Sequence, residues 1–207
     1  MTVAVISGDI VSSRQMSTPE LDTTLALVSS VLAHYDTAGT KHHFFRGDGF
    51  QITLPKPSLA LRCALQLKLT LIGQRQQKQG SDCRLAIGVG EISQLRRNGA
   101  TSSGEAFELS GLGLDSLKGN EIALFSSDPT LAPYQLLLQW LSFHLQGLTP
   151  KQAQVLQPFL FESVTEQSQL AQRLGLDQST VSRHLSRAGA PLLQQLLSQF
   201  EQVLKDD

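Results

Sequence analysis

The chain has 207 residues, of which 41% are hydrophobic and 17% are charged, and its formal net charge is −1. These values exclude a disordered protein and predict one or two folded domains. Because the net charge is close to zero, any binding to nucleic acid must come from a local group of side chains. The sequence holds neither a run of about 18 apolar residues nor a secretion signal, so we expect a cytoplasmic protein without a membrane span.

The first 126 residues alternate between the periodicities of strands and helices. Strands are predicted at 3–6, 43–45, 50–54, 84–90 and 122–125, and helices at about 18–32, 58–72 and 104–117. Ser58 is the expected cap of the second helix, and the turn at Asp48-Gly49 predicts a hairpin. The order β-α-β-β-α-β-α-β predicts an α/β (α+β) fold with a ferredoxin-like sheet that helices cover.

The composition changes at Ser126, after which only helical periodicity remains. We expect one domain at 1–127 and an all-α domain at 131–207, with helices at roughly 132–145, 150–162, 166–174, 178–188 and 191–204. Trp140 is expected in the core, together with Leu136, Leu137 and Leu141. The last helix carries an apolar stripe from Leu192 to Leu204, which either the rest of the chain or a second copy must cover.

A helix-turn-helix pattern occupies about residues 165–188. Ala171 is small where two helices cross, Gly175 permits the left-handed backbone that ends the first helix, and Asp177 caps the second helix. The second helix is expected to expose short hydrogen-bonding side chains and arginines: Gln178, Ser179, Thr180, Ser182, Arg183 and Arg187. Such side chains suit base edges and phosphates in a DNA major groove, so we expect double-stranded DNA as the partner. The alternative is a helical hairpin that touches only protein.

This segment resembles bacterial helix-turn-helix regulators. The residues Leu148-Thr149-Pro150-Lys151-Gln152 resemble the helix that precedes the motif in the sigma-factor region-four and LuxR-type families. Between residues 165 and 189 there are three arginines against Glu166 and Asp177. Because phosphate contacts dominate affinity for DNA, this small charge predicts that two copies act together as a homodimer.

Two aspartates stand at strand ends in the first part of the chain. Asp9 follows the first strand and Asp48 lies at the tip of the hairpin, and in a ferredoxin-like sheet these strands are neighbours. Two convergent carboxylates are a usual way to hold Mg²⁺ against a nucleotide, which makes Asp9 and Asp48 candidate metal ligands. The alternative is that Asp9 caps a backbone turn and Asp48 serves only the hairpin.

Four short motifs in the first 125 residues resemble the class III nucleotide cyclase domain in order and spacing. They are Ser7-Gly8-Asp9-Ile10-Val11-Ser12, Arg46-Gly47-Asp48-Gly49-Phe50, Leu85-Ala86-Ile87-Gly88-Val89-Gly90-Glu91 and Gly104-Glu105-Ala106-Phe107. The resemblance implies that Asp9 and Asp48 hold Mg²⁺. It also implies a nucleotide ligand bound by Ile10, Val11, Ser12 and Arg46.

The chain departs from the cyclase pattern where the cyclases carry out their chemistry. Their transition-state Asn and Arg fall on Glu108 and Leu112, and their base-selecting Lys falls on Phe44. Loss of a transition-state arginine commonly costs ~10³-fold or more in rate. We therefore do not expect cyclisation, and no catalytic residue is assigned.

The opening Asp9-Ile10-Val11-Ser12-Ser13-Arg14, the altered cyclase-like domain and the helix-turn-helix together resemble the bacterial SatD family. The function expected is a DNA-binding transcription regulator whose first domain senses a nucleotide with Mg²⁺ or mediates dimerisation. One alternative is a Mg²⁺-dependent nucleotide hydrolase or transferase that uses Asp9 and Asp48 with Glu91 or Glu108. Another is an interaction module that contacts the transcription machinery.

Overall fold

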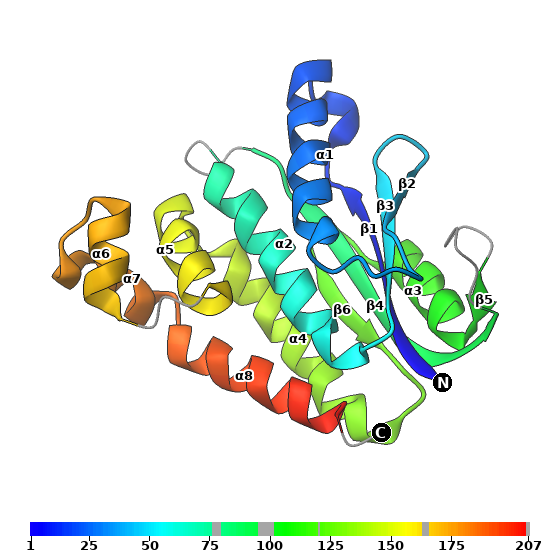
Figure 1. Cartoon of the computed structure of the whole chain (residues 1–207). Helices are drawn as coiled ribbons and strands as arrows, with labels where there is room; N and C mark the ends of the chain where they lie inside the picture. The colour runs from blue at the N-terminus through cyan, green and yellow to red at the C-terminus, as the bar shows by residue number, and fades with distance from the viewer. Residues whose placement is uncertain (76–79, 95–101, 120, 163–165, 206–207) are drawn as a thin grey trace.

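The computed structural model describes residues 1–75, 80–94, 102–119, 121–162 and 166–205. The strands are β1 (Thr2–Ile10), β2 (His43–Phe45), β3 (Gly49–Leu54), β4 (Cys83–Gln94), β5 (Ser103–Gly104) and β6 (Ile122–Phe125). The helices are α1 (Thr18–Ala33), α2 (Ala60–Gln74), α3 (Glu105–Ser116), α4 (Ala132–Gln146), α5 (Pro150–Phe161), α6 (Gln167–Leu174), α7 (Gln178–Arg187) and α8 (Ala190–Val203). Figure 1 shows the sheet with α1 and α2 on one side and α3 on the other.

The sheet has the strand order of a ferredoxin-like fold. Strand β1 lies between β3 and β4, antiparallel to both, and β2 completes the hairpin beyond β3. Strand β6 pairs with β4 in parallel, and the short β5 pairs with the end of β4. The predicted order of the main strands and helices is confirmed, and β5 is an addition because two residues are too few for a periodic signal.

The two faces of β1 are covered by different helices. Ala4, Ile6 and Ile10 belong to the main hydrophobic core, which includes residues of α1 and α2. Val3 and Val5 point to the opposite face and pack against Ala106 of α3. Because side chains alternate along a strand, the odd-numbered Asp9 lies on the α3 side of the sheet, beyond the end of that helix.

Helix α2 begins two residues after the position predicted from Ser58. A 3-10 turn at Pro57–Leu59 precedes it, Leu59 is its N-cap, and Ser58 is buried within that turn, so the expected cap is wrong. Eleven of the fifteen residues of α2 are buried. A helix that is buried on nearly every side must be covered by two layers. One layer is the sheet, and the other is formed by the helices that follow β6.

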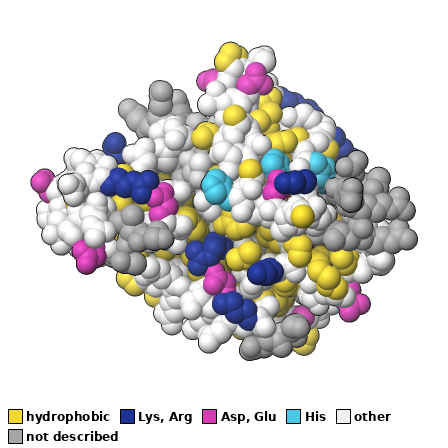
Figure 2. Space-filling view, in the orientation of Figure 1, with side chains coloured by type: hydrophobic (Ala, Val, Ile, Leu, Met, Phe, Trp, Pro, Cys, Tyr) yellow, Lys and Arg dark blue, Asp and Glu magenta, His cyan; other side chains and the backbone are white. Residues whose placement is uncertain are grey.

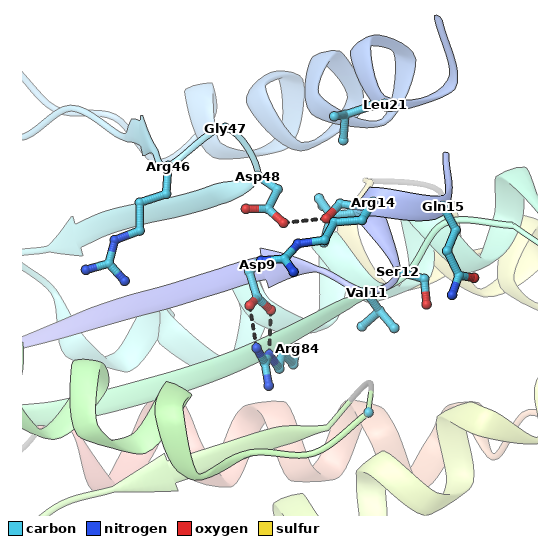
Figure 3. Close-up of a pocket in the computed structure, with 13 residues that line it drawn as sticks. Asp9, Val11, Ser12, Arg14, Gln15, Leu21, Arg46, Gly47, Asp48 and Arg84 are labelled. Atoms are coloured by element: carbon cyan, nitrogen blue, oxygen red, sulfur yellow. Dashed lines mark hydrogen bonds and ion pairs between the residues drawn. The ribbon is translucent and has the colours of Figure 1, made fainter. Parts of the chain in front are cut away.

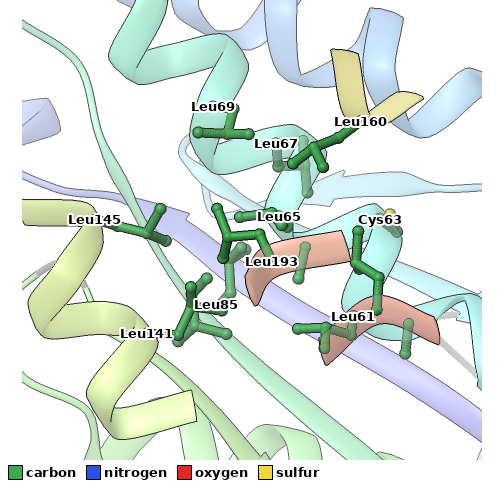
Figure 4. Packing of buried hydrophobic residues seen from close by; sticks show 14 of the residues in the cluster. Leu61, Cys63, Leu65, Leu67, Leu69, Leu85, Leu141, Leu145, Leu160 and Leu193 are labelled. Carbon is green, nitrogen blue, oxygen red and sulfur yellow. The ribbon is translucent and has the colours of Figure 1, made fainter. Parts of the chain in front are cut away.

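The C-terminal helices share one hydrophobic core with the sheet. Figure 4 shows leucines of α2 packed among Leu141 and Leu145 of α4, Leu160 of α5 and Leu193 of α8. The predicted boundary near Ser126 coincides with the end of β6 and the 3-10 turn at Pro129–Leu131. The five predicted helices are found within two residues of their expected ends, but α4, α5 and α8 do not form a core separate from the sheet.

The prediction that Trp140 lies in the core is wrong. Of the four residues expected there, only Leu141 is buried, whereas Trp140 is 64% exposed, Leu136 60% and Leu137 42%. The stripe on the last helix is covered mainly by the chain itself, since Leu193, Leu197, Phe200 and Leu204 are buried. Leu192 remains 72% exposed. Within the described ranges, no helix is long and apolar enough to cross a membrane.

Candidate functional site

A pocket of about 720 Å³ lies at the end of β1, between the hairpin loop and the turn that follows β1. Figure 3 shows it with Asp9, Asp48 and three arginines around it. Its lining residues are Asp9, Ile10, Val11, Ser12, Ser13, Arg14, Gln15, Leu21, Arg46, Gly47, Asp48, Arg84 and Gly119. Both predicted aspartates and all four predicted nucleotide-binding residues therefore line one pocket, as the order of the strands required.

Asp9 is held by an arginine of the neighbouring strand. In the antiparallel register of β1 and β4, Asp9 lies directly opposite Arg84, so both side chains leave the same face of the sheet. The guanidinium donates from Nε and Nη2 to the two carboxylate oxygens of Asp9, at 2.6 and 2.7 Å. This hydrogen bonding raises the pKa of Arg84. Such a bidentate ion pair is among the strongest and most directional in proteins.

Asp48 is held by the turn after β1. Its carboxylate accepts a hydrogen bond from the Ser13 hydroxyl at 2.5 Å, and its backbone carbonyl accepts one from the amide of Ile10 at 3.3 Å. The amide of Val11 donates to the carbonyl of Asp82 at 2.9 Å. The expected phosphate cradle at Ile10 and Val11 thus has both of these amide groups engaged within the fold. The two residues line the pocket, but their amides are not the groups that meet a ligand.

Two residues of the pocket have an unusual backbone conformation. Ser12 has φ 59° and Arg46 has φ 54°, and they are the non-glycine residues with positive φ in the described ranges. This conformation costs ~1–2 kcal/mol for a residue with a side chain. Strained residues of this kind concentrate at binding and catalytic sites. Their presence in one pocket makes it a candidate functional site independently of any motif.

The residues of the pocket do not fit Mg²⁺ as they lie. Both oxygens of Asp9 accept hydrogen bonds from Arg84, so in this arrangement they are engaged by a cation of the protein itself. Three arginines, at 14, 46 and 84, line the pocket against two aspartates. This charge balance favours an anion over a divalent cation.

The structure separates the proposed catalytic partners from the aspartates. Glu91 pairs with Thr2 at the start of β1, seven residues from Asp9, which is about 24 Å along a strand. Glu108 is exposed on α3 and is not among the residues of the pocket. Within one chain, neither glutamate lies where it could act with Asp9 and Asp48. Arg84 is a pocket residue outside all the quoted motifs, and Arg14 is one that the SatD-like motif contains but to which no role was assigned.

The second candidate site is formed by α6 and α7. Helix α6 ends in a Schellman motif: the amide of Leu176 donates to the carbonyl of Ala171 at 2.9 Å, and that of Gly175 to Gln172 at 3.3 Å. Gly175 has φ 63°, as predicted. Ala171 and Val181 are buried where the helices meet. The structure thus has two helices joined by a tight turn over residues 167–187, which is the arrangement that a helix-turn-helix requires, and Thr165 lies outside the described residues.

The outer face of α7 is open to solvent. Gln178, Ser179, Ser182, Arg183 and Arg187 are exposed, and Thr180 is partly exposed and accepts a hydrogen bond from Arg183 at 3.4 Å. The inner face of α7, formed by Val181 and Leu185, is buried. The six residues predicted to bind DNA therefore lie on the part of α7 that a ligand can reach.

Lys151 is a third basic residue near the two arginines of α7, since all three charges act on His184. The pKa of His184 is lowered, first by partial burial and then by the positive charges of Arg183, Arg187 and Lys151. Lys151 is an exposed residue in the first turn of α5, and sequence reasoning did not assign it to this site. Elsewhere, on the face seen in Figure 2, basic and acidic side chains are interspersed.

No protein-family model and no curated protein matches this chain. Among solved structures, it is similar to an adenylate/guanylate cyclase/hydrolase from Silicibacter pomeroyi, with 21% identity and a TM-score of 0.48 over 60% of this chain and 75% of that one. It is also similar to adenylate cyclases from Trypanosoma brucei, with 16% identity and a TM-score of 0.47 over 59% and 72% of the two chains. A regulator of polyketide synthase expression from Bifidobacterium adolescentis aligns with 98% of this chain and 80% of its own, at 12% identity and a TM-score of 0.27.

Proposed function

We propose that this protein is a DNA-binding regulator whose sheet carries a pocket for an anionic ligand. The observation that carries the proposal is the exposed outer face of α7, the second of two helices joined by the tight turn at Gly175. In helix-turn-helix motifs the N-terminal part of the second helix reaches base edges. Gln178, Ser179 and Ser182 are the exposed residues suited to that role. The resemblance to SatD and to region-four and LuxR-type regulators agrees with it.

The basic residues of this site are suited to phosphates. Arg183 and Arg187 lie toward the C-terminal end of α7, and Lys151 is close enough to lower the pKa of the neighbouring His184. Each phosphate contact adds to the affinity for DNA, and this contribution becomes smaller as the salt concentration rises. Three basic side chains per copy give modest affinity, which makes binding by two copies the expected mode.

Replacement of the α7 arginines tests the proposal. The double variant Arg183→Ala/Arg187→Ala should lose affinity for duplex DNA. The negative slope of log K against log salt should become shallower by about 1.8, since each phosphate contact contributes ~0.9 to its magnitude. The measurement is fluorescence anisotropy with labelled duplexes enriched from a random pool, at several salt concentrations. The matched control is Lys56→Ala/Lys205→Ala, which removes the same charge from exposed residues outside α7.

Three outcomes distinguish the candidates. Loss of affinity in the α7 variant alone supports a DNA interface. Equal loss in both variants would mean that DNA responds only to net charge, and would contradict the proposal. If no duplex binds and the α7 variant instead loses capture of RNA polymerase, the site is the protein-interaction module.

The pocket at the end of β1 is proposed to take a phosphate group, as in a nucleotide. Arg14, Arg46 and Arg84 supply positive charge, and Arg84 is oriented by its ion pair with Asp9. The paired donors of Arg84 are bonded to Asp9, and its Nη1 donates to the carbonyl of Leu117 at 2.9 Å. Arg84 therefore contributes mainly its charge, and the planar, paired donors that phosphates prefer would come from Arg14 and Arg46. Arg84 would then stand where the cyclase resemblance implies a metal. We infer binding without turnover, because neither Glu91 nor Glu108 lies within reach of this pocket.

Calorimetry with ATP and GTP, each with and without Mg²⁺, tests the pocket. Binding should occur without Mg²⁺ and should weaken in Arg84→Ala and Arg46→Ala, by about tenfold for the loss of one charged hydrogen bond. Lys41→Ala, an exposed basic residue on the segment before the hairpin, is the control. Binding that requires Mg²⁺ and is lost in Asp9→Ala would restore the metal hypothesis. Nucleotide turnover that is lost in Asp48→Ala would restore the enzyme alternative.

A further inference from the structure

Helix α4 has an exposed face of large apolar side chains. None of its fifteen residues is Asp, Glu, Lys or Arg. Leu136 is 60% exposed, Leu137 42%, Trp140 64% and Phe143 71%. An exposed helix normally carries charged residues on its outer face. Depletion of charge with enrichment of aromatic residues is instead the composition of an interface core.

The aromatic residues form a ridge with a defined shape. The rings of Trp140 and Phe143 meet edge to face, with centroids 6.2 Å apart and an interplanar angle of 88°. This arrangement is a favoured one for aromatic pairs, so the two side chains hold each other in place. A ridge that is ordered before binding loses little conformational entropy on burial.

A groove of about 440 Å³ runs beside this ridge, between α4 and α8. Leu137, Leu141, Leu192, Leu193 and Leu196 form its apolar walls. Its polar lining residues are neutral apart from the titratable His144, whose Nε2 lies 2.9 Å from the carbonyl of Ala188. Trp140 belongs to the ridge and also lines the groove, and Leu137 of the same exposed face of α4 lines the groove as well. Ridge and groove therefore lie on one continuous surface.

We propose that this ridge and groove form the interface between two copies of this chain, related by a two-fold axis. In a two-fold contact the same surface serves both copies, so it must be complementary to itself. A protruding aromatic pair next to an apolar groove meets that condition, because the ridge of each copy fills the groove of the other. The absence of charged side chains on α4 removes the repulsion that identical surfaces would otherwise produce.

The patch is large for a monomer and would form the apolar centre of a standard interface. The exposed parts of Trp140 and Phe143 alone amount to roughly 250 Å², judged from aromatic side chains of about 150–250 Å² each, and Leu136, Leu137 and Leu192 add to them. The largest patch on a typical monomer is ~300–600 Å², and a standard interface buries ~800 Å² per partner. The glutamines at 139, 195 and 199 supply the polar rim.

Sedimentation velocity of the full chain at about 1 to 100 µM tests this proposal. The wild type should sediment as a dimer within this range. Trp140→Glu and Leu192→Glu should each raise the dimer dissociation constant about 30-fold or more, as expected of buried interface residues. Leu112→Glu is the matched control, because Leu112 is an equally exposed leucine, at 71%, on α3. Circular dichroism should show native helix content in all variants, since the replaced side chains are exposed.

Fluorescence provides a second measurement that needs no variant. Trp140 is the one tryptophan of the chain, so its emission should shift to shorter wavelength as the protein concentration rises and the indole is buried. A wild type that stays monomeric throughout, or a dimer that Trp140→Glu and Leu192→Glu leave intact, would overturn the proposal. A monomer whose emission shifts only with lipid vesicles would assign the patch to a membrane surface instead.

Discussion

Gly175 shows how one residue shapes the candidate DNA interface. Its φ of 63° turns the chain between α6 and α7, and a Cβ atom there would meet nothing within 4 Å. The space is open, so the requirement for glycine lies in the backbone conformation alone. Asparagine tolerates this region better than other non-glycine residues, and a β-branched residue tolerates it poorly.

Gly175→Val should therefore destabilise the protein by about 1–2 kcal/mol, and Gly175→Asn by clearly less. Urea unfolding followed by circular dichroism measures both. Equal losses would show that the substitutions act through packing, which the open space at this position does not predict.

Single residues also mark where sequence reasoning succeeded and where it did not. Asp9 and Asp48 could be placed together because the strand order follows from periodicity. Arg84 was missed, although the β1–β4 register puts it opposite Asp9, because register depends on pairing between distant strands. The prediction for Trp140 was wrong because hydrophobicity alone cannot distinguish a core position from an exposed one.

At the scale of elements, α7 combines an open outer face with a histidine next to buried residues. His184 has a lowered pKa in the folded protein, whereas in the unfolded chain it is near 6.5. The unfolded state therefore binds the proton more readily. The stability that neutral His184 contributes is present above about pH 6.5 and is lost as the pH falls toward the lower folded value.

His184→Gln should remove this dependence. Between pH 8 and pH 5.5, the free energy of unfolding should fall more steeply in the wild type than in the variant, as measured by urea titration at each pH. Parallel curves for the two proteins would show that other groups account for the pH response.

The elements themselves were largely predictable because their signals are local. Apolar stripes, the Ser17 and Thr149 capping boxes and the hairpin turn each lie within a few residues of sequence. The cap at Ser58 failed because a 3-10 turn intervenes, and such a turn has the same local signals as the first turn of an α-helix.

On the scale of the whole molecule, α2 joins the sheet to the C-terminal helices. Leu65 is 1% exposed and lies in the core that both parts share. Leu65→Ala should cost about 2–5 kcal/mol and should leave a single unfolding transition. Hydrogen exchange should accelerate in β1 and in α5 alike, whereas Leu112→Ala should change neither. Two separate transitions would mean that the halves are independent domains.

The absence of charged side chains from α4 has a consequence for how the protein would respond to its surroundings. Contacts between neutral apolar surfaces are insensitive to ionic strength, whereas contacts between arginines and phosphates weaken steeply as salt rises. Under the two proposals above, a rise in salt would therefore release duplex DNA while leaving the two copies of the chain together.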